Sequence, residues 1–400
     1  MSTDGIGIVS PDDHLVEPPE LWRDRLPAKY RESGPRVVRE RGRMAFDYDP
    51  NSSSDLKWET AEDGAWGDVW YYENMRSPQL LPSCAAGTPQ DQMALRPITF
   101  DEMRPGFYRQ RERLADMDIA GVEAAVCFPN PFTRFCGQRF LAATDKDLAL
   151  LCVKAYNDFM LDEWWAGSQG RLIPLCVIPL WDTKLAIAEV ERVAARGVRA
   201  ISFSELPSNL GLPSIHSGHW DELFATCDRS GVSLMMHIGS SSKFLITSTD
   251  APDAVRAAVT PINSAMCMID WLASGLFERF PSLKIILAEC EIGWIPFFLQ
   301  KLDRIWDHRR SWNEMGDTVP RPPSEYFRDH VFCCFFDDRF GVENIQHIGE
   351  DNIMFETDYP HQDTSWPDSR KAAAIQTAGL SADVAEKVLR TNALRLLQPV

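Results

Sequence analysis

The sequence lacks the cysteine spacings of a disulfide framework: it has ten cysteines but no CxxC pair. Several cysteines lie inside apolar runs, so we expect reduced thiols in the core of a cytoplasmic protein. A basic-then-apolar leader and an apolar run of about 18 residues are also missing, which argues against secretion and against a membrane partner. No basic cluster accompanies the formal net charge of -17. We therefore expect no nucleic-acid partner.

The composition, 44% apolar and 25% charged over 400 residues, is that of an ordinary globular protein, and we expect one domain over residues 1–400. Short apolar runs typical of buried strands alternate with helical patterns. The strand-like runs cover residues 6–9, 121–129, 172–180, 198–204, 232–239, 282–290, 330–336 and 352–360. Strict alternation predicts a parallel sheet, and eight units predict an α/β fold of the TIM (β/α)8 barrel type. A doubly wound sheet is disfavoured, because no glycine-rich loop follows the first run.

A long insertion is predicted after the first strand, over residues 21–105. The segment is rich in proline, glycine, serine and acidic residues and shows no sustained helical or strand period. Its aromatic part, residues 58–72, is interleaved with glycine and acidic residues, a pattern that disfavours a core strand. A disordered linker rarely carries so many large aromatic side chains, and we therefore expect an ordered segment that covers another part of the protein. Lining of a pocket, packing at a homodimer interface and simple packing within the chain are the open alternatives, and a homodimer is expected.

Polar side chains gather at the predicted strand ends, where a TIM barrel places its active site. Asp12 and His14 follow the first strand and, being two residues apart, would project together. His237 ends the fifth strand and Glu289 the sixth, and Asp358 ends the eighth. Two neighbours have open roles: His361 would orient Asp358, touch substrate or be a plain loop histidine, and Glu17 would be an outer metal ligand or the cap of a turn.

Imidazole and carboxylate together predict one divalent metal ion. Zn²⁺ is the first expectation, and a carboxylate-rich set would favour Mn²⁺ or Fe²⁺. Such an ion lowers the pKa of a bound water and polarises a substrate oxygen. Asp358 could then act as ligand, as base, or as both.

Four stretches resemble the amidohydrolase superfamily, in particular the branch of aminocarboxymuconate semialdehyde decarboxylase, gamma-resorcylate decarboxylase and oxalomesaconate hydratase. They are PDDHLVEPPELW (11–22), MMHIG (235–239), LKIILAECEIGWIP (283–296) and FETDYPHQDTSWP (355–367). The resemblance implies metal ligation by Asp12, His14, His237 and Asp358. The chain departs from the branch at residue 289, where a glutamate stands in place of an acid/base histidine.

Three functions follow as hypotheses. Because Glu289 replaces that histidine, we first expect hydrolysis of an amide, lactone or carbon-carbon bond in a small organic acid or aromatic compound. Non-oxidative decarboxylation of an aromatic or unsaturated carboxylic acid is the alternative, and a catalytically silent barrel that binds a ligand is a third possibility. The predicted catalytic residues are Asp358, Glu289 and His361, and the predicted substrate contacts are Trp294, Phe128 and Phe203.

Overall fold

The structure is a computed structural model that describes residues 5–46, 56–248, 250–309, 312 and 315–398. Its centre is a barrel of eight short parallel strands, each overlapping one of the predicted runs. They are β1 (Ile8–Val16), β6 (Val122–Asn130), β7 (Leu172–Ile173), β8 (Ala200–Ser202), β9 (Ser233–His237), β10 (Ile285–Ala288), β11 (Val331–Phe335) and β12 (Ile353–Phe355). The predicted TIM-barrel fold is confirmed.

The barrel closes from two hydrogen-bonded sheets, one ordered β1-β6-β7 and the other β12-β11-β10-β9-β8. A single parallel bridge between Cys176 and Ile201 joins them on one side. On the other side the His14 N–H donates to the Tyr359 carbonyl (2.6 Å), and the Asp358 N–H donates to the Asp12 carbonyl (3.0 Å). The first and last strands therefore hold Asp12, His14 and Asp358 next to one another.

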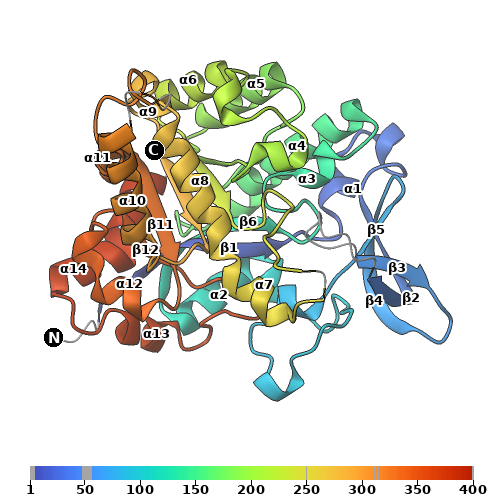
Figure 1. Cartoon of the computed structure of the whole chain (residues 1–400). Helices are drawn as coiled ribbons and strands as arrows, with labels where there is room; N and C mark the ends of the chain where they lie inside the picture. The colour runs from blue at the N-terminus through green and yellow to red at the C-terminus, as the bar shows by residue number, and fades with distance from the viewer. Residues whose placement is uncertain (1–4, 47–55, 249, 310–311, 313–314, 399–400) are drawn as a thin grey trace.

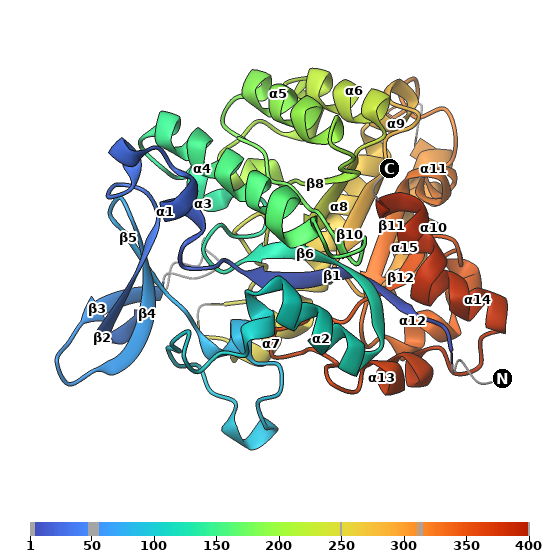
Figure 2. The ribbon, with the colours of Figure 1, turned by 180° about the vertical axis from the view of Figure 1, so that it is seen from behind.

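Helices surround the barrel on its outer face (Figures 1 and 2). One of them, α5 (Thr183–Ala194), is capped by the Asp182 side chain, which accepts the N–H groups of Lys184 and Leu185. Residues 253–279 form three separate helices. The remaining helices are α1 (Leu21–Arg25), α2 (Gln110–Ala120), α3 (Gln138–Leu141), α4 (Lys146–Phe159), α6 (Asp221–Ser230), α7 (Asp253–Val259), α8 (Pro261–Ala273), α9 (Leu276–Arg279), α10 (Ile295–Arg309), α11 (Pro323–His330), α12 (Arg339–Glu343), α13 (Ser369–Gln376), α14 (Ala382–Glu386) and α15 (Asn392–Leu397).

Side chains along the strands alternate between the barrel interior and the helices. In β9, Met235 belongs to the interior cluster, whereas Leu234 and Met236 pack in the outer core. In β12, Met354 is interior. Because side chains two residues apart share a face, His237 follows Met235 to the inside. The alternation therefore decides which polar residues can meet at the barrel end.

The insertion contains strands, and the prediction that its aromatic segment disfavours strands is wrong. It forms a four-stranded antiparallel sheet in the order β3-β2-β4-β5. The strands are β2 (Arg36–Phe46), β3 (Leu56–Thr60), β4 (Ala65–Tyr72) and β5 (Met75–Pro78). Two glycines make room for the Trp58 indole, since a Cβ would lie 2.3 Å from it at Gly42 of β2 and 3.4 Å from it at Gly67 of β4. Trp70 and Tyr72 are buried against Phe132 in the loop after β6, with ring centroids 4.9 and 6.1 Å apart.

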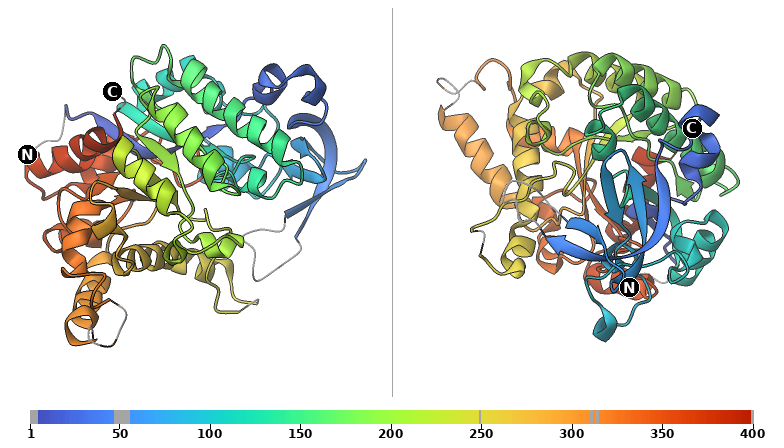
Figure 3. Two further views of the ribbon diagram at one scale, coloured as in Figure 1. Left: turned by 90° about the horizontal axis from the view of Figure 1, so that it is seen from above. Right: turned by 90° about the vertical axis from the view of Figure 1, so that its right-hand side faces the viewer.

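Seen from the side that carries the insertion, this sheet stands in front of the barrel (Figure 3). Residues 17–35, which include α1, connect it to the carboxyl end of β1, and it lies on the side of the barrel toward which β1 runs (Figure 2). All ten cysteines are buried and unbridged, as predicted. Within the described part of the chain, no helix is both long and apolar enough to cross a bilayer.

Candidate active site

Asp12 and His14 project from β1 into the barrel end. Both are fully buried, and His14 Nε2 lies 3.7 Å from Asp12 Oδ1. The residue between them, Asp13, takes a different set of partners. Its carboxylate accepts the Thr357 hydroxyl (2.5 Å) and lies 3.4 Å from an Arg113 nitrogen. The two-residue spacing thus places Asp12 and His14 together, as predicted.

His237, the last residue of β9, completes a group of three with Asp12 and His14. Its Nε2 is 3.2 Å from His14 Nε2 and 3.4 Å from Asp12 Oδ2. Its Nδ1 lies 2.6 Å from the Ile238 carbonyl oxygen, which can only accept a hydrogen bond. Nδ1 therefore carries the proton, and the lone pair of Nε2 points at the group. The Phe135 ring stacks on the imidazole at 4.0 Å.

Asp358 and His361 extend the group beyond β12. Asp358 Oδ1 lies 3.1 Å from His14 Nε2 and 2.9 Å from His361 Nδ1. The His361 ring stacks on His14 at 3.7 Å, and its Nε2 lies 2.8 Å from the Asn130 side-chain nitrogen. Although burial raises the pKa of Asp358, its electrostatic interaction with His361 and the hydrogen bonds from His14 and His361 outweigh it and leave the pKa below its usual range.

The donor set fits a divalent metal ion. Neither carboxylate oxygen of Asp12 has a hydrogen-bond partner among the described residues, although both are buried. Burial lowers the pKa of His14, and that of His237 to about 3, so both imidazoles are neutral. Burial and then the charges of Glu356 and Asp358 raise the pKa of Asp12, which shows how poorly these carboxylates are compensated without a cation. The prediction of a divalent-metal site is confirmed at the level of this group of aspartate and histidine side chains.

Glu289 stands at the open side of the cluster. Its Oε2 lies 3.2 Å from His237 Nε2, and its side chain keeps 24% of its surface exposed. The backbone is left-handed there (φ 53°), and the Glu289 N–H donates to the Glu356 carboxylate at 3.2 Å. Burial and the neighbouring charge of Asp358 raise the pKa of Glu289 well above its ordinary value.

Glu17 and Phe203 lie apart from the cluster. The Glu17 carboxylate accepts the N–H groups of Phe132 (3.2 Å) and Thr133 (2.8 Å), and Glu17 belongs to neither group of potential ligands. In this geometry Glu17 anchors the loop after β6. Phe203 shares the outward face of its strand with Ile201 and packs on Trp220 at 5.2 Å, because side-chain alternation turns it away from the interior.

The other two predicted substrate contacts lie closer to the cluster. Phe128 faces the interior, with its ring 5.0 Å from that of His237. Trp294 is half-buried, and its indole N–H donates to the Cys290 carbonyl at 2.7 Å, which holds it beside the turn that carries Glu289.

Sequence reasoning missed several residues of the site region. Glu356 could have been found, because it lies two residues before Asp358 and one strand period predicts a shared face. Asn130 is the last residue of β6 and Phe135 lies in the loop after it. A loop has no strand or helix period in its sequence, so the sequence does not show which of its side chains face the cluster. Asp13 was hidden beside Asp12, since only the structure shows which acid faces which way.

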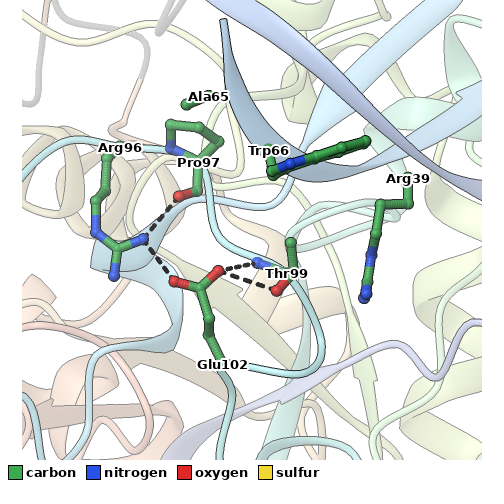
Figure 4. Close-up of a pocket in the computed structure, with 7 residues that line it drawn as sticks. All are labelled: Arg39, Ala65, Trp66, Arg96, Pro97, Thr99 and Glu102. Atoms are coloured by element: carbon green, nitrogen blue, oxygen red, sulfur yellow. Dashed lines mark hydrogen bonds and ion pairs between the residues drawn. The ribbon is translucent and has the colours of Figure 1, made fainter.

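A pocket of about 550 Å³ on the insertion is separate from this cluster (Figure 4). Its cations already have partners: Arg39 pairs with Asp68 and Asp101, and Arg96 pairs with Glu102. None of the predicted site residues lines it. The lining residues are Arg39, Ala65, Trp66, Arg96, Pro97, Thr99 and Glu102.

The fold and the cluster agree with the comparisons with known proteins. Residues 68–398 match the sequence model of the amidohydrolase family, and the chain belongs to this family. The prediction of an enzyme of the amidohydrolase type is confirmed.

Among its relatives, gamma-resorcylate decarboxylase of Rhodococcus jostii is 29% identical in an alignment 358 residues long that covers 83% of this chain and 98% of that protein. Two crystal structures share the fold. An amidohydrolase from Mycobacterium avium subsp. paratuberculosis superimposes with a TM-score of 0.69 at 20% identity, covering 98% of this chain and 99% of the other. A dihydroxybenzoic acid decarboxylase from Polaromonas sp., with bound manganese and 2-nitroresorcinol, has a TM-score of 0.60 at 17% identity and coverages of 98% and 96%.

Proposed function

We propose that the protein is a metal-dependent, non-oxidative decarboxylase of an aromatic carboxylic acid. The observation that carries the proposal is the partly exposed Glu289 carboxyl, which faces a buried group of aspartates and neutral histidines. Decarboxylation of this kind breaks the bond between the ring and the carboxylate, releases CO₂ and puts a proton on the vacated carbon. A carboxyl group with a raised pKa supplies that proton, whereas hydrolysis would need a base.

Asp12, His14, His237 and Asp358 would hold the ion. We propose Mn²⁺ in place of the Zn²⁺ expected first, because two carboxylates and two imidazoles suit Mn²⁺ and the Polaromonas decarboxylase carries manganese. A divalent ion there stabilises negative charge that develops on a substrate oxygen.

The surrounding side chains orient the reacting groups. Asn130 lies against His361 Nε2, and His361 in turn holds the Asp358 oxygen at 2.9 Å. Phe128 and Phe135 present aromatic rings around His237, which favours a flat aromatic substrate over an extended one. The names of the curated relatives, gamma-resorcylate decarboxylases, support a hydroxybenzoate as substrate class.

The test incubates Mn²⁺-loaded protein in D₂O with a panel of hydroxybenzoates and, separately, with amides and lactones. We expect CO₂ release from a hydroxybenzoate and one deuterium on the ring carbon that lost the carboxylate, read by proton NMR. Turnover of an amide or lactone without CO₂ release would instead establish the hydrolase hypothesis. The same protein treated with chelator serves as the control and should release no CO₂.

A further inference from the structure

A buried carboxyl beyond the end of β8 takes no part in the reaction proposed above. Glu205 is only 2% exposed, and one of its oxygens, Oε1, accepts hydrogen bonds from two separate elements. The turn after β9 contributes the Gly239 N–H (3.0 Å), the Ser241 hydroxyl (2.8 Å) and, more weakly, the Ser241 N–H (3.4 Å). Helix α8 contributes the Asn263 side-chain amide at 3.3 Å. Glu205 Oε1 is thus held mainly by the turn that follows His237, whereas Oε2 is buried without a hydrogen-bond partner among the described residues.

One peptide group lies between Glu205 and His237. Its N–H, that of Gly239, donates to Glu205 Oε1, and its carbonyl, that of Ile238, accepts the proton on His237 Nδ1 at 2.6 Å. Hydrogen bonds on the two ends of one amide reinforce each other, because an acceptor at the N–H draws more negative charge onto the carbonyl oxygen. The carboxylate and the imidazole are therefore coupled through two hydrogen bonds and a single amide.

We propose that Glu205 is a positioning residue that acts on the metal ligand His237 through the Ile238–Gly239 peptide. A histidine ligand commonly donates its second N–H to a carboxylate or a backbone carbonyl, which fixes the ring and raises its basicity. Here the carbonyl takes that place directly and the carboxylate stands one amide behind it. The inference rests on the proposed metal role of His237.

The turn itself leaves little freedom around this peptide. Gly239 has φ +84°, and a Cβ there would lie 3.0 Å from the Phe244 ring and 3.2 Å from the Phe135 ring. Phe135 in turn stacks on the His237 imidazole. The Ile238–Gly239 peptide is therefore held by Glu205 on one side and by two aromatic rings on the other, so a change at Glu205 is transmitted to the imidazole.

The experiment compares Glu205→Gln with Ser241→Ala. The glutamine keeps the shape and one acceptor oxygen but removes the negative charge. The alanine removes one donor to the same oxygen and leaves the carboxylate on the Gly239 N–H. We measure the dissociation constant for Mn²⁺ by competition with a chelator, and the ¹⁵N shifts of His237 in the metal-free protein after histidine labelling. Melting of each metal-free variant verifies folding, and Glu205→Asp, whose shorter arm withdraws the carboxylate from Gly239, replaces the glutamine if that variant does not fold.

We expect Glu205→Gln to bind Mn²⁺ about tenfold more weakly and to shift the His237 Nδ1 resonance, while Ser241→Ala changes neither. Equal loss of affinity in both variants would reduce Glu205 to an anchor of the turn and overturn the proposal, as would wild-type affinity in Glu205→Gln. His237→Ala distinguishes a failure of the proposed metal site from a failure of the coupling to Glu205. If it binds Mn²⁺ like the wild type, the proposed metal site itself fails. If it loses the ion while Glu205→Gln does not, only the coupling fails.

Discussion

Glu289 lies between the buried group of proposed metal ligands and the exposed side of the site, and it is the residue whose replacement is most informative. Glu289→Gln keeps the side-chain shape but removes the ionisable proton. We expect product formation to fall at least about 100-fold, the usual contribution of a positioned acid, with bound Mn²⁺ unchanged, because Glu289 is not among the proposed ligands. Turnover with the best hydroxybenzoate and the metal content of the purified variant are the two measurements.

Glu291→Gln is the matched control for that experiment. Glu291 shares the same turn and the same left-handed backbone (φ 53°), but burial and the charges of Asp338 and Asp337, not the ligand group, raise its pKa to about 8. We expect nearly unchanged turnover in this variant. Full activity in Glu289→Gln would remove Glu289 from the mechanism and with it the acid on which the decarboxylation proposal rests.

Glu205 gives a prediction on stability and pH. Burial raises its pKa from 4.5 to about 7, so between these values the folded metal-free protein binds more protons than the unfolded chain. Stability due to this group is present below pH 4.5 and is lost as the pH rises through about 7. A tenfold change in proton affinity corresponds to about 1.4 kcal/mol, so the loss is about 3 kcal/mol. Urea unfolding at pH 5 and pH 8 should show this loss relative to Glu205→Gln, and parallel pH dependence in the two proteins would contradict it.

At the scale of elements, the junction of β1 with the segment after β12 depends on a buried ion pair. Arg113 of α2 is completely buried, lies 3.4 Å from an oxygen of Asp13, and stacks over the Tyr359 ring at 4.2 Å. The Asp13 carboxylate also accepts the Thr357 hydroxyl and the Tyr359 N–H. The pair therefore joins the two segments that carry Asp12 and Asp358.

Arg113→Met should destabilise the protein by about 3–5 kcal/mol, because it leaves the buried Asp13 carboxylate without its cation. Arg339→Met is the matched control. Arg339 also pairs with an acid, Glu343, but its side chain is 86% exposed, so we expect a change below about 1 kcal/mol. Urea unfolding of both variants measures the difference. A loss below 1 kcal/mol in Arg113→Met would show that the junction does not depend on this pair.

The elements also show what the sequence could predict. The eight strands were predictable, because buried parallel strands read as short apolar runs between helices. It was harder to predict whether a given side chain faces the barrel interior or the helices. Phe203 was predicted to contact substrate at a strand end, but the strand places Ile201 and Phe203 outward and Ala200 inward. The strands of the insertion were missed because their aromatic side chains are buried by contact with Phe132, far along the chain, and local spacing carries no record of that contact.

At the scale of the whole molecule, the candidate site exists only because the barrel closes. The proposed ligands Asp12 and His14 lie near one end of the chain, Asp358 lies near the other, and His237 lies between them. The segments that carry these residues are too far apart in the sequence to form a recognisable metal-binding motif. What made them predictable was the rule that parallel strands of a barrel end at one face. The rule did not identify Glu205 and Phe135, because both lie in loops beyond the strand ends. Glu205 contacts the Gly239 N–H and Phe135 contacts the His237 ring.

Removal of metal tests the molecule as a whole. Without a cation, the carboxylates of Asp12, Glu356 and Asp358 repel one another in the barrel end, as the raised pKa of Asp12 indicates. We expect chelation to lower the melting temperature and Mn²⁺ to restore it, with about 2.7 kcal/mol of stabilisation at a hundredfold excess over the dissociation constant. Asp12→Ala is the control. It should melt no lower than the metal-free wild type, because it removes a repelling charge, and it should gain nothing from Mn²⁺. A wild-type melting temperature that is the same with chelator and with Mn²⁺ would favour the silent ligand-binding barrel over the metal enzyme.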